Sequence, residues 1–497
     1  MAPPSLRRMC AGLLVLSMLP LPGQSREPER QDFASNLRRQ VHLEGEGVQR
    51  YSIGERMRHY GVPAVSVAVV EGCEVVDARA FGAARPDGTA AGRDTIFMAG
   101  SVSKVVAAMG ALSLVEDGVL SLDEDVTRHL GSWTLPRPDN VGQGAVTLRH
   151  LLSHSAGLTV AGFKGYPHGV VLPGPTDILD GKAPANTPAV RIEAEPGSAW
   201  RYSGGGFVLL QHVMEQATAK TFAEVIRRRV LDPAGMSNSA YGSPAQSGHG
   251  SDAAMGTLAN GEPIPDGWRL YPEHAAAGLW STPTDLSRLA IGLVRSLRGE
   301  RHAVLGADTA KEMLRQQAGS WGLGVELSPK GEPPKVSHTG APVGYRTLWL
   351  VFPETCQGAT IMTNADEGMT LAYEVARALA DQYRWPDPMS SERALSIPLT
   401  DEIARRFVGT YQLRDFPAEH FEIELAADRT LTWSRQGRGR RTLAAASAGM
   451  LVSPDSGMRL VSLDSTSSGP VSTLELRFGG GVNVAQRLAH EASPGVP

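Results

Sequence analysis

The sequence has very little cysteine. Cys10, Cys73 and Cys356 are the only three among 497 residues, and no two of them form a C-x-x-C pair. Three thiols are too few for a disulfide scaffold, and the missing pair excludes a zinc or iron–sulfur site built on cysteine. The fold must therefore depend on an ordinary hydrophobic core.

The chain also lacks an excess of positive charge. It has 48 Lys plus Arg against 52 Asp plus Glu, a formal net charge of −4. A surface that binds phosphate backbones usually shows a basic excess, so we expect no nucleic-acid partner. Hydrophobic residues at 42% and charged residues at 20% are close to globular averages, which excludes a wholly disordered or fibrous chain.

Long apolar runs are missing too. The run over residues 9–21 is 13 residues long, whereas a spanning helix needs about 20. Arg7 and Arg8 precede it and small residues follow, the layout of a secretory signal peptide. We therefore expect residues 1–25 to be a signal peptide, with a retained anchor as the alternative, and residues 26–40 to be a polar tether or a fraying first helix. The mature protein should be periplasmic or secreted, with no stable membrane span.

Hydrophobic periodicity indicates a mixed α and β chain over most of its length. We expect a strand–turn–strand over 62–81, paired strands over 346–352 and 358–363, and helices over 101–116, 207–216, 221–230 and 285–297. The stretch 162–196 is rich in glycine and proline with little periodicity. Such a segment usually shapes a binding site or is disordered.

Short alternating runs dominate the end of the chain. Those at 409–411, 421–425, 430–433 and 474–478 are separated by Gly, Ser and Asp, the pattern of a small antiparallel barrel or sandwich. We therefore predict an α+β domain over 41–388, a linker over 389–405 and a small all-β barrel domain over 406–490.

The sharpest local feature is Ser101-Val102-Ser103-Lys104 at the start of a predicted helix. A serine hydroxyl is a weak nucleophile until a base takes its proton. Residues three apart share one face of a helix, so Lys104 can reach the Ser101 oxygen. The spacing alone is a weak signal, because Ser101 as a helix N-cap and Lys104 as a solvated charge would give the same pattern.

Two further motifs follow in order, Tyr202-Ser203-Gly204 before a helix and His338-Thr339-Gly340 before the paired strands. With S-x-x-K they make the chain resemble the serine β-lactamase and penicillin-binding-protein superfamily, whose signature ends in K-T-G. The resemblance is greatest to its class C-like branch of esterases, D-aminopeptidases and DD-peptidases, in which the second motif is Y-x-N. Similar flanking stretches occur at 95–97, 148–158, 232–236 and 277–285, so the resemblance covers about 62–380.

The resemblance implies an α+β fold of the β-lactamase type, an antiparallel sheet flanked by helices, and no metal or organic cofactor. Ser101 would be acylated, Lys104 would activate it, and Tyr202 would be the second proton shuttle. The backbone N–H groups of Ser101 and Ala341 would form the oxyanion hole. A core tyrosine is the alternative for Tyr202.

Two positions depart from the branch pattern. Gly204 replaces the asparagine of Y-x-N, so an amide that would hold the substrate's acyl-amide group is missing. His338 replaces the lysine of K-T-G, whereas Thr339 and Gly340 are kept at the substrate-binding edge. Histidine titrates near neutrality and holds charge only part of the time, which disfavours a carboxylate-bearing substrate. An ordinary strand-end histidine is the alternative.

These departures favour an ester or a short peptide amide over a β-lactam. We therefore expect an exported serine hydrolase that acts on a small-molecule ester or peptide, with β-lactamase or DD-peptidase activity as the first alternative. A non-catalytic sensor or binding protein is the second, and the presence of Ser101, Lys104 and Tyr202 together argues against it. Branch members with an appended domain often narrow the cleft with it, and we expect the same of this barrel.

Other candidate features are weaker. Ser155 lies in a sequence close to the G-x-S-x-G elbow, but no apolar strand precedes it. His150 and His154 have a metal-ligand spacing without H-E-x-x-H or a nearby cysteine, so we expect satisfied scaffold histidines and no metal site. The arginines between 435 and 441 cluster in the barrel domain, where a solvated hairpin tip is the simpler interpretation.

In the branch that this chain resembles, the first and last strands of the sheet are antiparallel neighbours. Cys73 follows the turn after the first predicted strand, and Cys356 precedes the last one. The resemblance therefore implies a Cys73–Cys356 disulfide in an exported, oxidising setting. Two separately buried thiols are the alternative.

Overall fold

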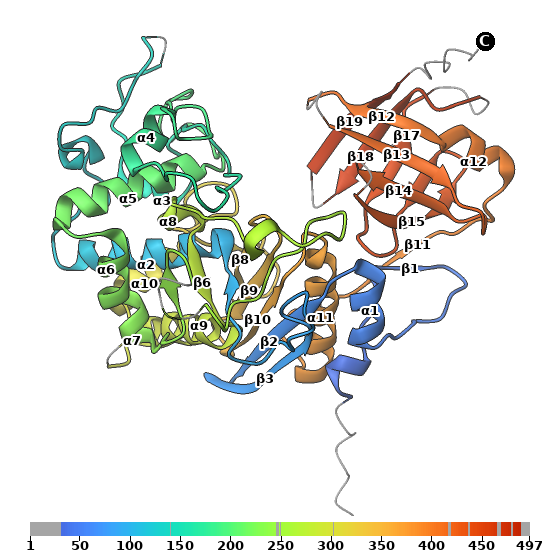
Figure 1. The fold of residues 1–497 in the computed structure, drawn as a ribbon, viewed down its shortest axis with the longest axis horizontal. Helices are drawn as coiled ribbons and strands as arrows, with labels where there is room; N and C mark the ends of the chain where they lie inside the picture. The colour runs from blue at the N-terminus through green and yellow to red at the C-terminus, as the bar shows by residue number, and fades with distance from the viewer. Residues whose placement is uncertain are drawn as a thin grey trace, which may run out of the picture.

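The computed structural model describes residues 31–488, apart from residues 140, 245–247, 249, 302, 416–418, 436–437, 465–468 and 479–480. The predicted signal peptide lies outside the described residues. Within them, a mixed α+β domain is followed by a closed β-barrel, which lies beside α1 (Ile53–Tyr60) and α11 (Gly368–Tyr383) (Figure 1). The predicted α+β fold class with a C-terminal barrel is confirmed.

Six strands of the described chain form one antiparallel sheet in the order β3-β2-β10-β9-β8-β7. Their bounds are β2 Ala64–Glu71, β3 Glu74–Gly82, β7 Glu326–Leu327, β8 Val336–Gly340, β9 Arg346–Phe352 and β10 Gln357–Thr363. The strands predicted at 62–81, 346–352 and 358–363 are confirmed. The first and last long strands, β2 and β10, are antiparallel neighbours in the middle of the sheet.

Helices cover both faces of this sheet. Along β9, Leu348 and Leu350 pack with α11, whereas Trp349 belongs to the core on the other face. There its indole N–H donates to the Leu286 carbonyl of α9 (Pro283–Leu297) at 2.8 Å. Because neither face meets water, β2 is apolar and buried along almost its whole length, rather than alternating.

Helix α2 (Ser103–Glu116) lies at the centre of the helical part of the domain. The residues between its large apolar side chains are small and are buried as well, so the expected amphipathic helix is instead enclosed on nearly all sides. A Cβ on Gly110 would stand 2.3 Å from the Ile226 side chain. Small residues therefore allow neighbouring helices to approach α2 closely.

The other elements of this domain surround α2 and the sheet. They are α3 Leu148–Leu152, α4 Pro175–Asp180, α5 Gly204–Thr218, α6 Phe222–Ile226, α7 Asp232–Ala234, α8 His274–Ala277, α10 Ala307–Leu314, β4 Phe97–Met98, β5 Ala240–Tyr241 and β6 Leu279–Ser281. The helix predicted over 221–230 is α6 continued by a π-helical turn, Arg227–Leu231. Among the described helices, none combines the length and apolar character needed to cross a membrane.

A disulfide joins Cys73 in the β2–β3 turn to Cys356 in the β9–β10 turn, with Cα atoms 5.1 Å apart. Pairing of β2 with β10 brings the two turns to the same edge of the sheet. The bond is the pairing that the resemblance implied, and it closes a loop with a sequence separation of 283.

The N-terminal strap, defined here as residues 31–51, is packed against the rest of the protein. Phe33 and Leu37 are buried, and β1 (Val41–Leu43) pairs in parallel with β11 (Glu392–Ala394). The prediction of a polar tether over 26–40 is therefore wrong for its described part, because two apolar residues in a charged segment reach the core. The predicted linker over 389–405 is also structured, since it contains β11 and the start of α12 (Asp401–Phe407).

The C-terminal barrel is closed by pairing of its first strand with its last. Its strands are β12 Gly409–Leu413, β13 His420–Leu425, β14 Leu431–Arg435, β15 Arg438–Ser447, β16 Met450–Val452, β17 Arg459–Ser462, β18 Thr473–Phe478 and β19 Gly481–Arg487. Alternate residues such as Tyr411, Phe421 and Ile423 point inward, and Phe407 of α12 joins them. Apolar side chains thus fill the interior as a core.

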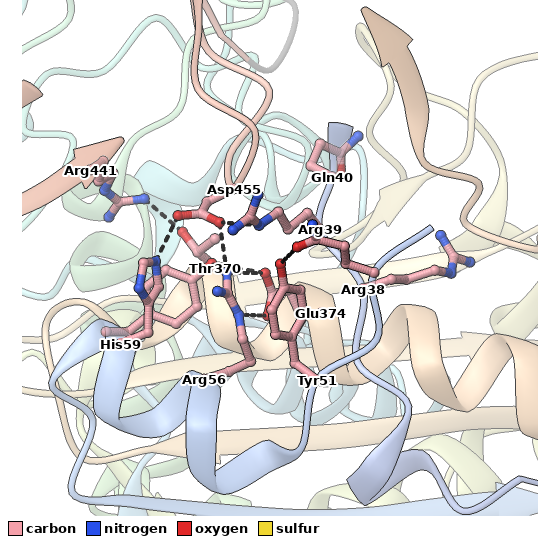
Figure 2. Close-up of polar contacts among 12 residues, drawn as sticks. Arg38, Arg39, Gln40, Tyr51, Arg56, His59, Thr370, Glu374, Arg441 and Asp455 are labelled. Carbon is pink, nitrogen blue, oxygen red and sulfur yellow. Dashed lines mark hydrogen bonds and ion pairs between the residues drawn. The ribbon is translucent and has the colours of Figure 1, made fainter. Parts of the chain in front are cut away.

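A buried ion-pair network joins the barrel to the first domain (Figure 2). Asp455, in the turn between β16 and β17, accepts from Arg56 of α1 at 2.6 Å and contacts His59 Nε2 at 2.8 Å. Arg56 also donates two 2.7 Å hydrogen bonds to Glu374 of α11, which is fully buried. Burial alone would raise the pKa of Asp455, but the His59 hydrogen bond and the Arg56 charge hold it well below its usual range.

Candidate active site

The chain enters α2 through a sharp turn at Gly100. Its φ is +56°, and a Cβ there would stand 2.4 Å from Pro342 Cδ, so a side chain is excluded by both conformation and space. A 3₁₀ turn over Gly100–Val102 leads into the helix. The Ser103 hydroxyl donates to the Gly100 carbonyl at 2.6 Å and accepts from the Leu279 N–H at 3.0 Å. These contacts fix Ser101 at the start of the helix.

Lys104 lies against Ser101 inside the protein. Its Nζ donates to Ser101 Oγ at 3.0 Å and to the Ala276 carbonyl of α8 at 2.7 Å, and the residue is 2% exposed. The amine also lies 5.1 Å from the centre of the Tyr202 ring and 5.6 Å from that of Phe207. This arrangement excludes the alternative in which Lys104 is a solvated surface charge.

Tyr202 stands in the segment just before α5 and is half-buried, which distinguishes it from a fully enclosed core tyrosine. His154 holds this segment: its carbonyl accepts from Arg201 N–H at 2.7 Å and its Nδ1 from Ser203 N–H at 3.2 Å. The His154 ring lies over the phenol, with centroids 4.2 Å apart. The Tyr202 ring, which comes from a segment distant in sequence, therefore lies beside the Ser101–Lys104 pair.

The sequence predicts a satisfied scaffold histidine at His154, and its Nε2 departs from that prediction. Nδ1 has a partner, but Nε2 is buried and makes no hydrogen bond within the described residues. Burial, and then the charges of Lys104 and His338, hold the pKa of His154 well below its usual range. A sequence signal for His154 exists, because the residue lies in 148–158, one of the stretches that carry the family resemblance.

The end of β8 forms the opposite side of the site. A Cβ on Gly340 would lie 2.0 Å from the Ala99 carbonyl oxygen, and Ala341 N lies 3.1 Å from where a Cβ of Gly100 would stand. The strand end and the start of α2 are thus in backbone contact. This brings the Ala341 N–H, predicted to be an oxyanion donor, close to the Ser101 backbone.

His338 is buried on β8 and is neutral. Burial, and then the charge of Lys104, lower the pKa of His338 to about 3. Its Nδ1 lies 2.7 Å from the Thr339 carbonyl oxygen, so Nδ1 carries the proton of the neutral ring. The expectation that this histidine is charged part of the time at neutral pH is therefore wrong, because the position is enclosed and already adjacent to a cation.

Gly204 starts α5 beneath an irregular loop. A Cβ there would stand 2.7 Å from the Phe163 ring and 3.0 Å from the Ala161 carbonyl oxygen. An asparagine at this position, as in Y-x-N, would collide with that loop. Phe163 lies in the glycine- and proline-rich stretch expected to shape a binding site, and it leaves no room for a Cβ at position 204.

An aromatic wall completes the site, and sequence reasoning missed it. Trp200 and Trp321 are stacked with ring centroids 6.0 Å apart, and Trp321 lies 5.3 Å from the His338 ring and 5.7 Å from the Tyr202 ring. Trp200 is 42% exposed. The wall therefore runs from the surface to the rings of Tyr202 and His338, and isolated tryptophans in the sequence give no signal of this convergence.

Ser155 and His150, the alternative candidates from the sequence, each contact a neighbouring polar group. Ser155 is buried, and its hydroxyl is 2.9 Å from that of Ser153. His150 Nδ1 accepts from the Thr147 N–H at the start of α3. In the described part of the chain, no three His, Cys, Asp or Glu side chains are grouped so as to hold a metal ion.

The sequence model of the Beta-lactamase family matches residues 51–384, which is more than half of the chain. The chain therefore belongs to the beta-lactamase family, and it is a serine hydrolase with the beta-lactamase fold. Its family includes esterases, DD-peptidases and amidases.

Several characterised relatives match most of their own length. Penicillin-binding protein 4* of Bacillus subtilis (strain 168) is 24% identical over 402 residues, covering 75% of this chain and 84% of that protein. Esterase EstB of Burkholderia gladioli is 28% identical over 364 residues, covering 62% and 88%. The D-alanyl-D-alanine-carboxypeptidase/endopeptidase AmpH of Escherichia coli (strain K12) is 23% identical over 326 residues, covering 61% and 79%.

Solved structures show the same fold. The octameric penicillin-binding protein homologue from Pyrococcus abyssi has a TM-score of 0.59 at 22% identity and covers 87% of this chain and 98% of its own. The D-amino acid amidase from Ochrobactrum anthropi SV3 has a TM-score of 0.53 at 22% identity, covering 67% and 94%.

Proposed function

We propose that this protein is an exported esterase or short-peptide amidase that forms an acyl-enzyme on Ser101. The observation that supports this most is the 3.0 Å contact between Lys104 Nζ and Ser101 Oγ. It joins a nucleophile to a base away from bulk water, the arrangement that activates a serine hydroxyl.

In the first step, after Lys104 has given its own proton to water, its amine accepts the Ser101 proton as Oγ bonds to the substrate's carbonyl carbon. The C=O electron pair moves onto oxygen, where the N–H groups of Ser101 and Ala341 stabilise it. Collapse of this intermediate breaks the bond to the alcohol or amine, which leaves with the proton passed through Lys104 and Tyr202. Water then attacks the acyl-enzyme by the same proton route, releasing the acid and restoring Ser101.

The surroundings of Ser101 favour an uncharged, apolar substrate. Neutral His338 provides no permanent cation for a carboxylate. Position 204 is a glycine packed against Phe163, so it provides no amide to hold an acyl-amide group. Trp200 and Trp321 offer aromatic surface on which an apolar acyl or leaving group can pack. Together these features favour an ester over a peptide with a free C-terminus.

Hydrolysis of cell-wall peptides or β-lactams is the second candidate. It is favoured by the relatives named penicillin-binding protein 4* and D-alanyl-D-alanine-carboxypeptidase. Such substrates carry a carboxylate, and a neutral histidine at position 338 disfavours them. A penicillin-binding-type sensor that is acylated without turnover is the third candidate.

Export to the periplasm or medium is part of the proposal. The Cys73–Cys356 disulfide supports it, because such bonds persist mainly in oxidising compartments. The signal-like pattern over residues 1–25 supports the same conclusion.

A hydrolysis panel tests the proposal. Short p-nitrophenyl esters, a D-amino-acid amide and a chromogenic cephalosporin are compared with wild-type enzyme and Ser101→Ala. We expect ester kcat/KM to exceed the other two by about tenfold or more, and Ser101→Ala to abolish all turnover. A cephalosporin rate equal to the ester rate would favour the second candidate, and stable acylation without turnover would favour the sensor.

A further inference from the structure

One face of α11 carries a polar stripe that receives the barrel and the N-terminal strap. Its members are spaced three and four residues apart, so they lie along a single line on the helix. They are Glu367, Thr370, Glu374, Arg377 and Asp381. The opposite face, including Leu371, Val375 and Leu379, packs on the sheet. We call these five polar residues the docking stripe.

The barrel contacts the first turn of this helix through the hairpin between β14 and β15. Arg441 donates to Thr370 Oγ1 at 2.7 Å and forms an ion pair with Glu367. A Cβ on Gly439 would stand 2.6 Å from the Glu367 carboxyl group, so the hairpin backbone lies directly against it. The solvated hairpin tip expected from the sequence is therefore wrong for Arg441, which docks between domains.

The neighbouring Arg440 shows that this contact is selective. It pairs with Glu424 of the barrel at 2.8 Å and its side chain is 67% exposed, whereas that of Arg441 is 18% exposed. Two adjacent arginines on one strand therefore serve different partners.

The residue before Glu367 holds the loop that follows β8. We call residues 341–345 the active-site turn. Asp366 Oδ1 accepts from the Gly344 N–H at 2.8 Å and from Arg346 at 3.0 Å. Arg346 also donates to the Pro342 carbonyl at 3.1 Å, and Pro342 packs on Gly100 next to Ser101. Asp366 thus fixes the turn that contains the Ala341 N–H.

We infer that Arg441 and Asp366 are positioning residues: docking of the barrel on Glu367 holds the start of α11, and through Asp366 it sets the active-site turn against Ser101. This inference rests on the proposed function of Ser101 and Ala341. It gives the C-terminal barrel a role in acylation that requires no barrel residue in contact with the substrate.

The barrel has a second, separate attachment, so the coupling can be broken without releasing the domain. Asp455 contacts Arg56 and His59, and neither contact involves Arg441. A defect in Arg441→Gln therefore reports on the start of α11 rather than on loss of the barrel.

The test compares Arg441→Gln, Glu367→Gln, their double variant and Asp366→Asn, with Arg440→Gln as the matched control. The readouts are kcat and KM for the best ester and the rate of labelling by a fluorophosphonate probe. Amide hydrogen exchange of the peptide that contains the active-site turn is measured in parallel. Thermal melting confirms that each variant is folded.

We expect Arg441→Gln and Glu367→Gln each to lower kcat and the labelling rate about three- to tenfold, with KM nearly unchanged. The double variant should show no additional loss, because both residues act through one contact. Asp366→Asn should have at least as large an effect and should speed exchange in the turn. Arg441→Lys should restore part of the rate, and Arg440→Gln should match wild type.

Wild-type rates and wild-type exchange in both Arg441→Gln and Glu367→Gln would overturn the inference. Equal losses in Arg440→Gln would overturn it as well, because charge alone would then explain them. If the probe does not label Ser101, the proposed function fails, whereas faster exchange in Arg441→Gln would still establish the coupling.

Discussion

Around Lys104, three buried ionisable groups each keep a polar atom without a hydrogen-bond partner among the described residues, and they are driven towards their neutral forms. His154 Nε2, His338 Nε2 and both carboxyl oxygens of Glu273 make no hydrogen bond within the described residues. Burial is the first cause in each case, lowering the pKa of His338 to about 3 and raising that of Glu273 to about 7. Glu273 lies just before α8, whose Ala276 carbonyl accepts from Lys104.

Between α11 and the barrel, the buried ionisable groups are paired with one another. Arg56 lies between Glu374 and Asp455, and the pKa of Asp455 is lowered rather than raised (Figure 2). The two regions thus differ in whether their buried polar groups have partners. Pairing fixes one domain on another, whereas the unpaired atoms of His154, His338 and Glu273 are buried at a cost in stability.

The largest expected effect is at Lys104. Lys104→Met removes the proposed base and should lower the rate of acylation about 10³-fold or more. Stability should not fall, because an apolar side chain replaces a buried amine. Fluorophosphonate labelling and urea unfolding measure the two effects, with the exposed Lys220→Met as the control. Acylation at the wild-type rate in Lys104→Met would contradict the account.

Replacing a buried cation with methionine at the domain interface should instead lower the stability of the protein. Arg56→Met leaves Glu374 and Asp455 buried without their shared cation, which should lower the free energy of unfolding by about 3–5 kcal/mol. Arg58→Met, on the exposed side of the same helix, should change it by less than about 0.5 kcal/mol. Equal stabilities of the two variants in urea unfolding would show that the network does not hold the domains together.

Glu273→Gln sharpens the comparison through pH. The pKa of Glu273 is raised from 4.5 in the unfolded chain to about 7 in the folded protein. The folded state therefore holds the carboxyl proton more tightly than the unfolded state does. The stability that this gives is fully present below pH 4.5 and is lost as the pH rises to 7. The variant cannot ionise, so at pH 8 it should be more stable than wild type by about 2–3 kcal/mol, whereas at pH 4.5 the two should be similar. Unfolding curves at the two pH values measure this, and a difference independent of pH would refute it.

Many of the strands and helices could be predicted from the sequence, because periodicity and motif spacing are local signals. Strands 346–352 and 358–363 were placed within one residue, and the helix that follows Ser101 ends at Glu116 as expected. The S-x-x-K pair could be recognised because residues three apart on a helix share a face. The polar stripe on α11 has the same kind of regular spacing and could have been found in the same way.

What could not be predicted depends on contacts between distant segments. The neutrality of His338 follows from its burial beside Lys104 and Trp321, and the loss of space at Gly204 follows from Phe163. The role of Arg441 follows from Glu367, 74 residues earlier in the chain. Phe33 and Leu37 lie in a charged segment whose composition predicted a tether, and only the core that receives them shows otherwise.

The most direct test of the central claim is to label the wild-type protein with a fluorophosphonate, digest it and identify the modified residue by mass spectrometry. The account predicts a single phosphonylated serine at position 101, with labelling lost in Ser101→Ala. Modification of Ser155 in place of Ser101, or no modification of a folded protein, would contradict it.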